Sequence, residues 1–464
     1  MIFPPPIALH VSSLFQHTSS LPHLLQLHSL LLKAALDHHL FVASKLVSSL
    51  CPLSLPHARS VLSTLPTPPP TFAWNTLIRA YADSDSPHEA VHLFSVLRRT
   101  EAGRPDHFTY PFVLRACGRA SLLRVGETVH ALVLKTGLLS DLYVGNTLLH
   151  MYSCCGMFDC VRKVFDGMSL RDVVSWTSMI QGCLDCGHPL EALMTFSEMR
   201  KANVKPNSVT LLSLLSASSY LGSPHIGRSI HSYTVVNSIK LDVALGAALV
   251  GMYAKCGLVE EAFQVFKSMQ EQDLQSWTIM ISGFVEHGQW ERAIDLFSQM
   301  EARGVRPDST MFSTILCACS HLGMVDEGRK MFSRMVNEFH IKPTIEHYGC
   351  MVDLFGRAGL LETAYEFIKS MPIAPNNVIM RSFLGACREH GRFLDVDEGL
   401  MKLLLEEEPD LGSNYVIAAS MSALSGKWSN VAMIRSNISK RGLKKVRACS
   451  WVEASPEVQL IQSS

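Results

Sequence analysis

A 35-residue pattern that returns at wide spacing constrains this chain more than any other feature of its sequence. The stretch 173–207 (VVSWTSMIQGCLDCGHPLEALMTFSEMRKANVKPN) reappears 101 residues downstream, where Trp176 aligns with Trp277 and Pro206 with Pro307. It also aligns 102 residues upstream, where Trp176 meets Trp74. Self-similarity at a fixed spacing is typical of repeat architectures, so we expect an array of similar units instead of one globular core.

The segments between these three copies repeat as well. Met151-Tyr152, for example, aligns with Met252-Tyr253. Cutting at the recurrent Pro-Asp, Pro-Asn or lone Asp predicts consecutive units of 31 to 36 residues up to residue 376, with a degraded repeat in the N-terminal segment 1–39. The remaining residues are 377–444 and a tail over 445–464. The predicted units are 40–70, 71–106, 107–141, 142–172, 173–207, 208–242, 243–273, 274–308, 309–344 and 345–376.

Each unit carries two apolar patterns of helical period. In unit 173–207 they predict two helices, with Gly187 and Pro189 in the turn between them and Pro206 at the end of the second. One hairpin cannot bury both apolar faces, so stability must come from stacking neighbours into an all-α superhelix. The repeated tryptophans Trp74, Trp176 and Trp277 are then expected to fill the core between helices and not to stack on bases.

Composition narrows the function classes. The chain has 41 basic and 41 acidic side chains and therefore no formal net charge, which argues against tight binding to nucleic acid through phosphate neutralisation alone. Readout of bases by hydrogen bonds stays open. No run of about 18 apolar residues occurs, so we expect no membrane span.

The 13 cysteines are mostly embedded in apolar repeat positions, as expected of small core residues in a reducing compartment. Cys183 and Cys186 form a CxxC pair, but no second pair follows, so no metal site is predicted. The N-terminus lacks an acidic residue before Asp37, which resembles an organellar transit segment, yet Lys33 is its first basic residue, so that signal is weak.

The repeated residues resemble those of the pentatricopeptide repeat, with a W-[NT]-x-[LM]-I start, an EA-x-x-LF centre and a final P-[DN]. The alternation of unit lengths resembles the plant subfamily of P, L and S repeats, which implies a right-handed α-solenoid. Residues 377–410 and 414–442 resemble the two halves of this subfamily's E-type extension, and Cys449 to Glu453 resembles the start of the segment that follows it. This resemblance implies two further helical repeats over 377–444.

In relatives that continue, the resemblance implies that a cytidine-deaminase-like domain comes next. A zinc deaminase needs H-x-E and a later P-C-x-x-C, and neither occurs in this sequence. We therefore expect no intrinsic catalysis and no cofactor. The resemblance implies instead that the E-like segment recruits a DYW-type deaminase or other editing factors in trans.

The resemblance also implies which residues contact RNA: the fifth residue of a unit, on its first helix, and the last residue, in the loop to the next unit. Amides and hydroxyls suit this task because they offer donors and acceptors to a base edge. The family's pattern then predicts U-N-U-A-N-N-G upstream of a target cytidine. The four informative pairs are Asn75 with Asp106, Asn146 with Asp172, Thr177 with Asn207, and Thr278 with Asp308.

Other positions fit this code poorly. The long units place Pro111, Leu212 and Ser313 at the fifth place, and Ala247 and Gly349 offer no side-chain hydrogen bond there. A competing interpretation of Asp106, Asn207 and Asp308 is that they cap helices or stabilise turns. The basic residues near the C-terminus could contact phosphates or form a solvated helix end, the interpretation we favour; they are Lys440, Arg441, Lys444, Lys445 and Arg447.

Three function classes follow. The first is sequence-specific binding of single-stranded RNA that guides C-to-U editing of an organellar transcript, in the mitochondrion or alternatively in the chloroplast. The second is an RNA-binding factor for organellar splicing or transcript stability, which the E-like segment disfavours. The third is a protein-binding scaffold of tetratricopeptide type, which the variable unit lengths disfavour because that repeat keeps a 34-residue period.

Overall fold

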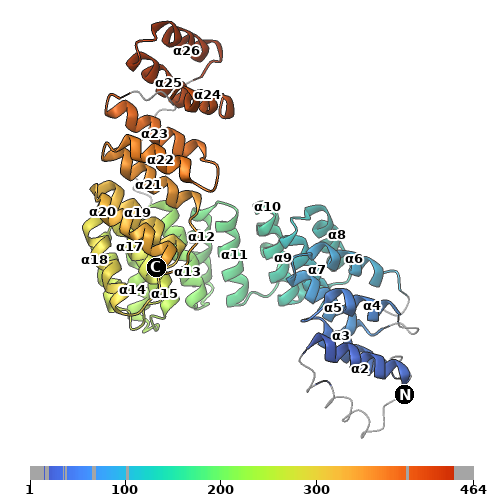
Figure 1. The fold of residues 1–464 in the computed structure, drawn as a ribbon. Coiled ribbons are helices and arrows are strands. Elements are labelled where there is room, and N and C mark those ends of the chain that lie inside the picture. The colour runs from blue at the N-terminus through green and yellow to red at the C-terminus, as the bar shows by residue number, and fades with distance from the viewer. Residues whose placement is uncertain are drawn as a thin grey trace. The chain divides into compact units, whose positions relative to one another are not determined.

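The structure, a computed structural model, describes residues 15, 20–34, 36, 39–64, 69–100, 104–392 and 397–443. Within these ranges all regular elements are helices and there is no strand (Figure 1). The chain divides into two compact bodies, residues 1–221 and 222–464, called here the N-terminal body and the C-terminal body. The prediction of an all-α solenoid is confirmed.

Helices in the N-terminal body follow the predicted hairpins, with odd-numbered helices from α3 onward as first helices of a unit and even-numbered helices as second ones. A short 3-10 turn, η1 (Leu138–Ser140), precedes α9. The helices are α2 (Leu21–Lys33), α3 (Leu40–Leu50), α4 (Leu55–Thr64), α5 (Thr71–Asp83), α6 (Pro87–Leu97), α7 (Thr109–Arg119), α8 (Leu123–Lys135), α9 (Leu142–Cys154), α10 (Phe158–Gly167), α11 (Val173–Asp185), α12 (Pro189–Lys201) and α13 (Ser208–Leu221).

The C-terminal body continues the same alternation of first and second helices. Its helices are α14 (Pro224–Val236), α15 (Val243–Lys255), α16 (Val259–Ser268), α17 (Leu274–Glu286), α18 (Trp290–Ala302), α19 (Ser309–Leu322), α20 (Val325–Asn337), α21 (Ile345–Arg357), α22 (Leu361–Ser370), α23 (Asn377–Glu389), α24 (Asp397–Glu407), α25 (Gly412–Leu424) and α26 (Trp428–Lys440).

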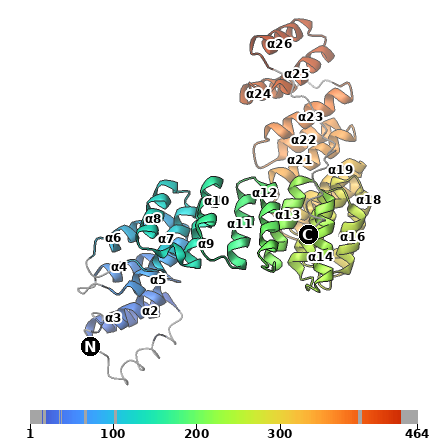
Figure 2. The same cartoon turned by 180° about the vertical axis from the view of Figure 1, so that it is seen from behind.

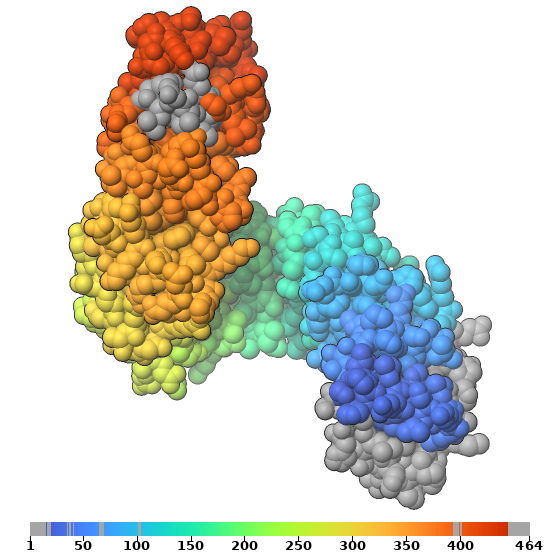
Figure 3. Space-filling view, viewed as in Figure 1, coloured from blue at the N-terminus to red at the C-terminus, as the bar shows by residue number. Residues whose placement is uncertain are grey.

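First helices of successive units pack against one another within each body. In the N-terminal body α5, α7, α9, α11 and α13 form one such series, and in the C-terminal body α15, α17, α19, α21, α23 and α25 form another (Figure 2). In most hairpins the first helix also packs on the second helix of the same unit. The surface colours accordingly change gradually along each body, because each hairpin contacts its neighbours in sequence (Figure 3).

The repeated tryptophans lie in this core, as the sequence predicted. Trp74, Trp176 and Trp277 are all buried. Trp176 packs edge-on against Phe165 and Trp277 against Phe266, with ring centroids 4.9 Å apart in both cases. Because the phenylalanine comes from the preceding unit and the tryptophan from the next, this contact joins consecutive hairpins at the same place in each copy.

The turn of unit 173–207 agrees with the sequence, but the end of its second helix does not. Gly187 has a left-handed backbone (φ +79°) and Pro189 begins α12. The prediction that Pro206 ends this helix is wrong, because α12 ends at Lys201. Asn203 takes a left-handed conformation (φ +56°), and the amide of Val204 donates to the carbonyl of Met199 at 3.1 Å, a turn that stops the helix first.

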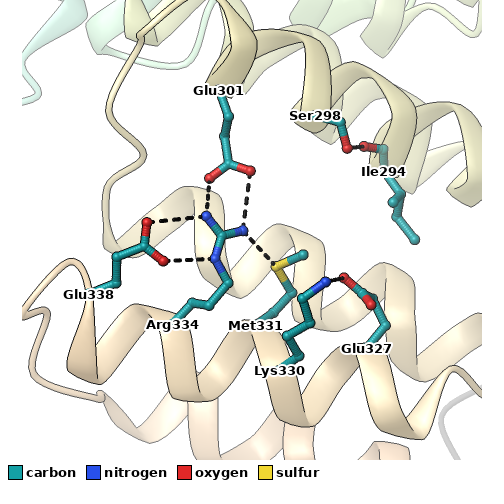
Figure 4. A network of polar contacts seen from close by, with 8 residues as sticks. All are labelled: Ile294, Ser298, Glu301, Glu327, Lys330, Met331, Arg334 and Glu338. Carbon is teal, nitrogen blue, oxygen red and sulfur yellow. Dashed lines mark hydrogen bonds and ion pairs between the residues drawn. The ribbon is translucent and has the colours of Figure 1, made fainter.

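Arg–Glu ion pairs join the second helices of successive units. Figure 4 shows the most extensive one, in which Arg334 of α20 makes two hydrogen bonds to Glu301 of α18, at 2.7 and 3.2 Å, and two to Glu338, at 2.9 and 3.5 Å. These bonds raise the pKa of Arg334 above its ordinary value. Similar pairs are Arg59–Glu89, Arg162–Glu198, Arg228–Glu261 and Arg292–Glu260. These ion pairs link consecutive hairpins at their second helices, where each exposed pair contributes about 0–1 kcal/mol.

In the part of the chain that the structure describes, no helix is long and apolar enough to cross a membrane. The same residues contain no group of three His, Cys, Asp or Glu side chains that could hold a metal ion. Cys183 is buried in α11 and Cys186 follows that helix, half-buried. The predicted tail with Lys444, Lys445, Arg447 and the segment 449–453 lies outside the described residues.

Candidate nucleic-acid interface

The predicted pair Asn75 and Asp106 forms a direct hydrogen bond. Asn75 lies on α5, is 7% exposed, and donates from Nδ2 to Oδ1 of Asp106 at 3.0 Å. The same carboxylate accepts from the backbone amides of Phe108 and Thr109 and so stabilises the turn that leads into α7. The hydroxyl of Thr109 lies 2.7 Å from Oδ1 of Asn75 and 2.9 Å from Oδ1 of Asp106. The fifth residue, the last residue and Thr109 thus form one network.

Thr177 and Asn207 are brought together through a third side chain. Oγ1 of Thr177 lies 2.7 Å from the carbonyl of Val173 and 2.7 Å from Oγ1 of Thr210. Thr210 in turn donates to Oδ1 of Asn207 from both its hydroxyl and its backbone amide, each at 2.9 Å. Asn207 is exposed, and among the described residues its amide nitrogen has no hydrogen-bond partner.

Asn146 and Asp172 lie near each other without a direct hydrogen bond of ordinary length among the described residues. The side chain of Asn146 lowers the pKa of Asp172. Asp172 accepts from the amide and the hydroxyl of Ser175, both at 2.9 Å, in the capping box that begins α11. Oδ1 of Asn146, in contrast, is buried and has no hydrogen-bond partner among the described residues.

Thr278 and Asp308 are not connected by any hydrogen bond in the described structure. The hydroxyl of Thr278 donates to the carbonyl of Leu274 at 2.8 Å. Asp308 accepts from the backbone amide of Met311 at 2.8 Å and caps α19. Both side chains are half-buried. The third residue of the next unit bridges the pairs at Asn75 and Thr177, but here that residue is Met311, whose side chain cannot donate a proton.

Asp172 and Asp308 cap the next helix, Asn207 accepts an amide at the start of α13, and Asp106 accepts amides in the turn that leads into α7. For Asp106, Asn207 and Asp308 this agrees with the competing interpretation of caps or turns. Burial alone would raise the pKa of Asp106, but the hydrogen bonds from Thr109, Asn75 and Phe108 together lower it. The pKa of Asp172 is likewise lowered, because bonds from Ser175 and Val174, together with the nearby side chain of Asn146, outweigh the effect of burial. Both groups are thus carboxylates at neutral pH and can only accept hydrogen bonds.

A row of exposed apolar side chains, not predicted from the sequence, accompanies these pairs. The second residue of a unit lies one helical turn before the fifth, on the same helix face. In five successive units this second residue is a large apolar side chain that is about half to two thirds exposed: Phe72, Phe108, Tyr143, Val174 and Val209. Alignment of the repeats shows an apolar residue at the second place of each of these units, so this row could have been found from the sequence.

A hollow of about 320 Å³ lies beside the pair of unit 173–207. Val174 and Val209 of this apolar row line it, together with Thr177 and Asn207. His150 and Gln181 line it further along. Its volume is at the lower end of the range of about 300–1,000 Å³ for ligand pockets. The hollow thus combines exposed apolar walls with the polar atoms of a predicted reading pair.

The fifth place is occupied differently in the C-terminal repeats. In α23 it is Arg381, which forms an ion pair with Glu408. Asn414 donates to the same carboxylate at 3.0 Å. Near the end of α26, Arg441 donates to the carbonyl of Pro409 at 3.2 Å, which agrees with the interpretation of this basic cluster as a helix end. Arg381 is therefore held by protein partners.

Family models match this chain over most of its repeats. The model described as PPR repeat matches residues 72–99, 146–173, 248–274, 310–338 and 346–373, and that of the PPR repeat family matches 171–218 and 272–321. The model of the E motif matches residues 394–453. Pentatricopeptide repeat-containing protein At5g48910 of Arabidopsis thaliana is 35% identical over 96% of this chain and 77% of its own length. The chain belongs to the pentatricopeptide repeat family.

A second pentatricopeptide repeat-containing protein of Arabidopsis thaliana, At1g59720, chloroplastic/mitochondrial, is 38% identical over 82% of this chain. The chain spans 62% of that relative's length. Among solved structures, the crystal structure of the pentatricopeptide repeat protein PPR10 in complex with an 18-nt psaJ RNA element has a TM-score of 0.58 at 17% identity. The match includes 94% of this chain and 64% of the PPR10 chain. This likeness supports the pentatricopeptide solenoid fold.

Proposed function

We propose that this chain binds single-stranded RNA in a sequence-specific manner and guides C-to-U editing of an organellar transcript, with a deaminase recruited in trans. The observation that carries the proposal is the coincidence of reading pairs and exposed apolar residues on the same first helices. Three successive pairs, beginning with Asn75 and Asp106, lie one helical turn from Phe72, Tyr143 and Val174.

Exposed aromatic and apolar side chains can stack on or pack against unpaired bases, whereas the neighbouring amides and hydroxyls can bind base edges. This division of roles suits single-stranded RNA, whose bases are accessible on both faces and edges. The family's relation to the PPR10 fold, which was solved with an RNA element, supports the same ligand class. Base readout also suits a chain with no net charge.

The finer parts of the proposal rest on the family. The E motif match at 394–453 supports recruitment of an editing factor through this segment. Relatives named as chloroplastic or mitochondrial support an organellar location. We propose the mitochondrion, with the chloroplast as the alternative, and a transcript that carries U-N-U-A-N-N-G upstream of the edited cytidine.

Binding measurements with short RNAs test the readout. Fluorescence anisotropy should give tighter binding to an RNA with U-N-U-A-N-N-G than to one with a changed base at the adenine, by about tenfold for one well-read position. The double substitution Thr177→Asn with Asn207→Asp should move the preference at that nucleotide from adenine to uracil and leave the other positions unchanged. An unchanged preference would refute the assignment of this unit.

Sequencing of organellar transcripts from a loss-of-function line tests the biological role. We expect one or a few cytidines downstream of such an element to stay unedited. Normal editing combined with mis-splicing or loss of a transcript would replace this proposal with the splicing or stability function.

A further inference from the structure

A hydroxyl at the third place of the following unit contacts two of the four reading pairs. Thr109 is fully buried, and its Oγ1 lies 2.7 Å from Oδ1 of Asn75 and 2.9 Å from Oδ1 of Asp106. It also accepts from the backbone amide of Asp106 at 3.0 Å. Thr210, equally buried, lies 2.7 Å from Oγ1 of Thr177 and 2.9 Å from Oδ1 of Asn207.

The network around Asn75 leaves its amide only one orientation. A carboxylate accepts hydrogen bonds but cannot donate, so Nδ2 of Asn75 must face Asp106. Oδ1 then faces the hydroxyl of Thr109, which can donate to it. One N–H and one lone pair of Asn75 remain for an external group, and both have directions set by these two partners. A uracil edge, with a carbonyl acceptor next to an N–H donor, is complementary to that arrangement.

We propose that this third residue is a positioning residue for the base-reading pair of the unit before it. Its hydroxyl holds the fifth side chain in the orientation that selects the base. The inference rests on the proposed RNA binding and goes beyond a readout by the fifth and last residues alone.

Two of the four reading pairs lack the bridging hydroxyl and serve as internal comparisons. Asn146 and Asp172 have the same identities as Asn75 and Asp106, but Ser175 bonds Asp172 only, and Oδ1 of Asn146 has no partner among the described residues. Selection of uracil should therefore be stronger at the nucleotide of unit 71–106 than at that of unit 142–172. Met311 takes the third place after Asp308, so Thr278 also lacks a bridge.

Binding of RNAs that differ at single nucleotides tests this role. The measured quantity is the ratio of Kd for cytosine to Kd for uracil at the nucleotide of unit 71–106. Thr109→Val, which keeps the shape and removes the hydroxyl, should lower that ratio about fivefold, the effect of one ordinary hydrogen bond. Thr109→Ser should restore it. The adenine-to-guanine selection at unit 173–207 should stay as in the unmodified chain.

Ser175→Ala is the matched control, because it removes a capping-box hydroxyl that does not contact the fifth residue. It should leave uracil selection at unit 142–172 unchanged. Melting curves establish that each variant is folded, and Thr210→Val provides the same test at unit 173–207 if Thr109→Val is not. Unchanged uracil selection in folded Thr109→Val would overturn the inference alone. Absence of selection at every nucleotide in the unmodified chain would overturn the proposed function, and this inference with it.

Discussion

The two bodies share one scaffold but differ at the second place of their units. In the N-terminal body that place holds Phe72, Phe108, Tyr143, Val174 and Val209, all exposed. The C-terminal body has Ala244, Gln275, Thr310 and Glu346 at the equivalent exposed positions of units 243–376, and a large apolar side chain, Val378, only in the repeat that follows them. Three of the four informative reading pairs also lie in the N-terminal body. The hairpin core is common to both bodies, whereas the exposed second place differs between them, and on the proposed function that place determines which units hold a base.

The comparison predicts its largest effect for the aromatic side chains. Replacing Phe72, Phe108 and Tyr143 together with alanine should weaken RNA binding by at least about a hundredfold, because each stacked base contributes about 1–3 kcal/mol. Anisotropy titration with an RNA that contains U-N-U-A-N-N-G measures this loss. Because these positions are exposed, the three substitutions should leave the melting temperature nearly unchanged.

The matched control replaces Gln275, Thr310 and Glu346 with alanine at the same places in the C-terminal body. We expect a change in Kd of less than about threefold, since none of these side chains offers a stacking surface as large as an aromatic ring. Equal losses for the two triple variants would remove the proposed difference between the bodies.

The shared scaffold should respond alike in both bodies. Trp74→Ala and Trp277→Ala each remove a buried indole, and each should lower the free energy of unfolding by about 3–5 kcal/mol. Trp428→Ala, at a position that is 69% exposed, is the control and should cost less than about 0.5 kcal/mol. Urea unfolding monitored by circular dichroism gives these values. A small effect at either core tryptophan would contradict the common core.

Capping and reading can be separated by two aspartates. Asp106 accepts the amide that begins α7 and contacts Asn75. Asp273 is the last residue of unit 243–273, whose fifth residue is Ala247, and it caps the following helix α17. Asp106→Ala and Asp273→Ala should each destabilise the chain by about 1 kcal/mol through the lost cap. Only Asp106→Ala should also reduce uracil selection. If the Asp273 variant altered selection at its own nucleotide, the assignment of readers would be incomplete.

The smallest predicted effect is a loss of stability in mild acid. Burial lowers the pKa of His130, His231 and His347 in the folded chain. As the pH falls through about 6.5, the unfolded chain binds these protons before the folded chain does, so stability decreases. Melting temperatures at pH 7.5 and 5.5 should differ by a few degrees more in the unmodified chain than in a variant with glutamine at His130 and His231.

The two bodies also differ in the histidines that a lower pH would protonate. His130 and His231 bond the hydroxyls of Tyr152 and Tyr253 in equivalent places, one in each body. His347, in the C-terminal body, accepts the backbone amide of Thr344 at Nδ1 and faces the carbonyl of Ser309 at Nε2. A protonated His347 could not accept that amide bond. Hydrogen exchange at pH 5.5 should therefore show greater loss of protection in the C-terminal body.

Much of the fold followed from sequence periodicity because hairpins of this kind are stabilised by near neighbours. The tryptophans, the apolar spacing and the glycine at 187 each act within one unit and the next. The helix end predicted at Pro206 was wrong because a left-handed turn at Asn203 follows the end of α12 at Lys201. Such a turn at a residue other than glycine leaves little trace in apolar patterning.

The candidate site was predictable only in part. The fifth and last positions came from the family resemblance, and the structure brings three of the four pairs together. The bridging hydroxyls of Thr109 and Thr210 were not predicted, because each lies in the unit after the one it serves and reads as an ordinary helix residue. The Arg–Glu pairs between second helices also join residues about one unit apart, beyond the reach of local pattern.

The last residue of a unit starts the next helix and, on the proposed function, also contacts a base. These two roles together restrict which residues can occupy the place. At Asp106, Asp172, Asn207 and Asp308 the same oxygen that belongs to a reading pair begins the next helix. Aspartate and asparagine both provide that oxygen and start helices about equally well, but they present different hydrogen-bonding groups beyond it. On the proposed readout, an exchange between them would change the groups offered to one nucleotide and keep the oxygen that starts the helix, so that new RNA sequences become reachable by mutations that cost little stability.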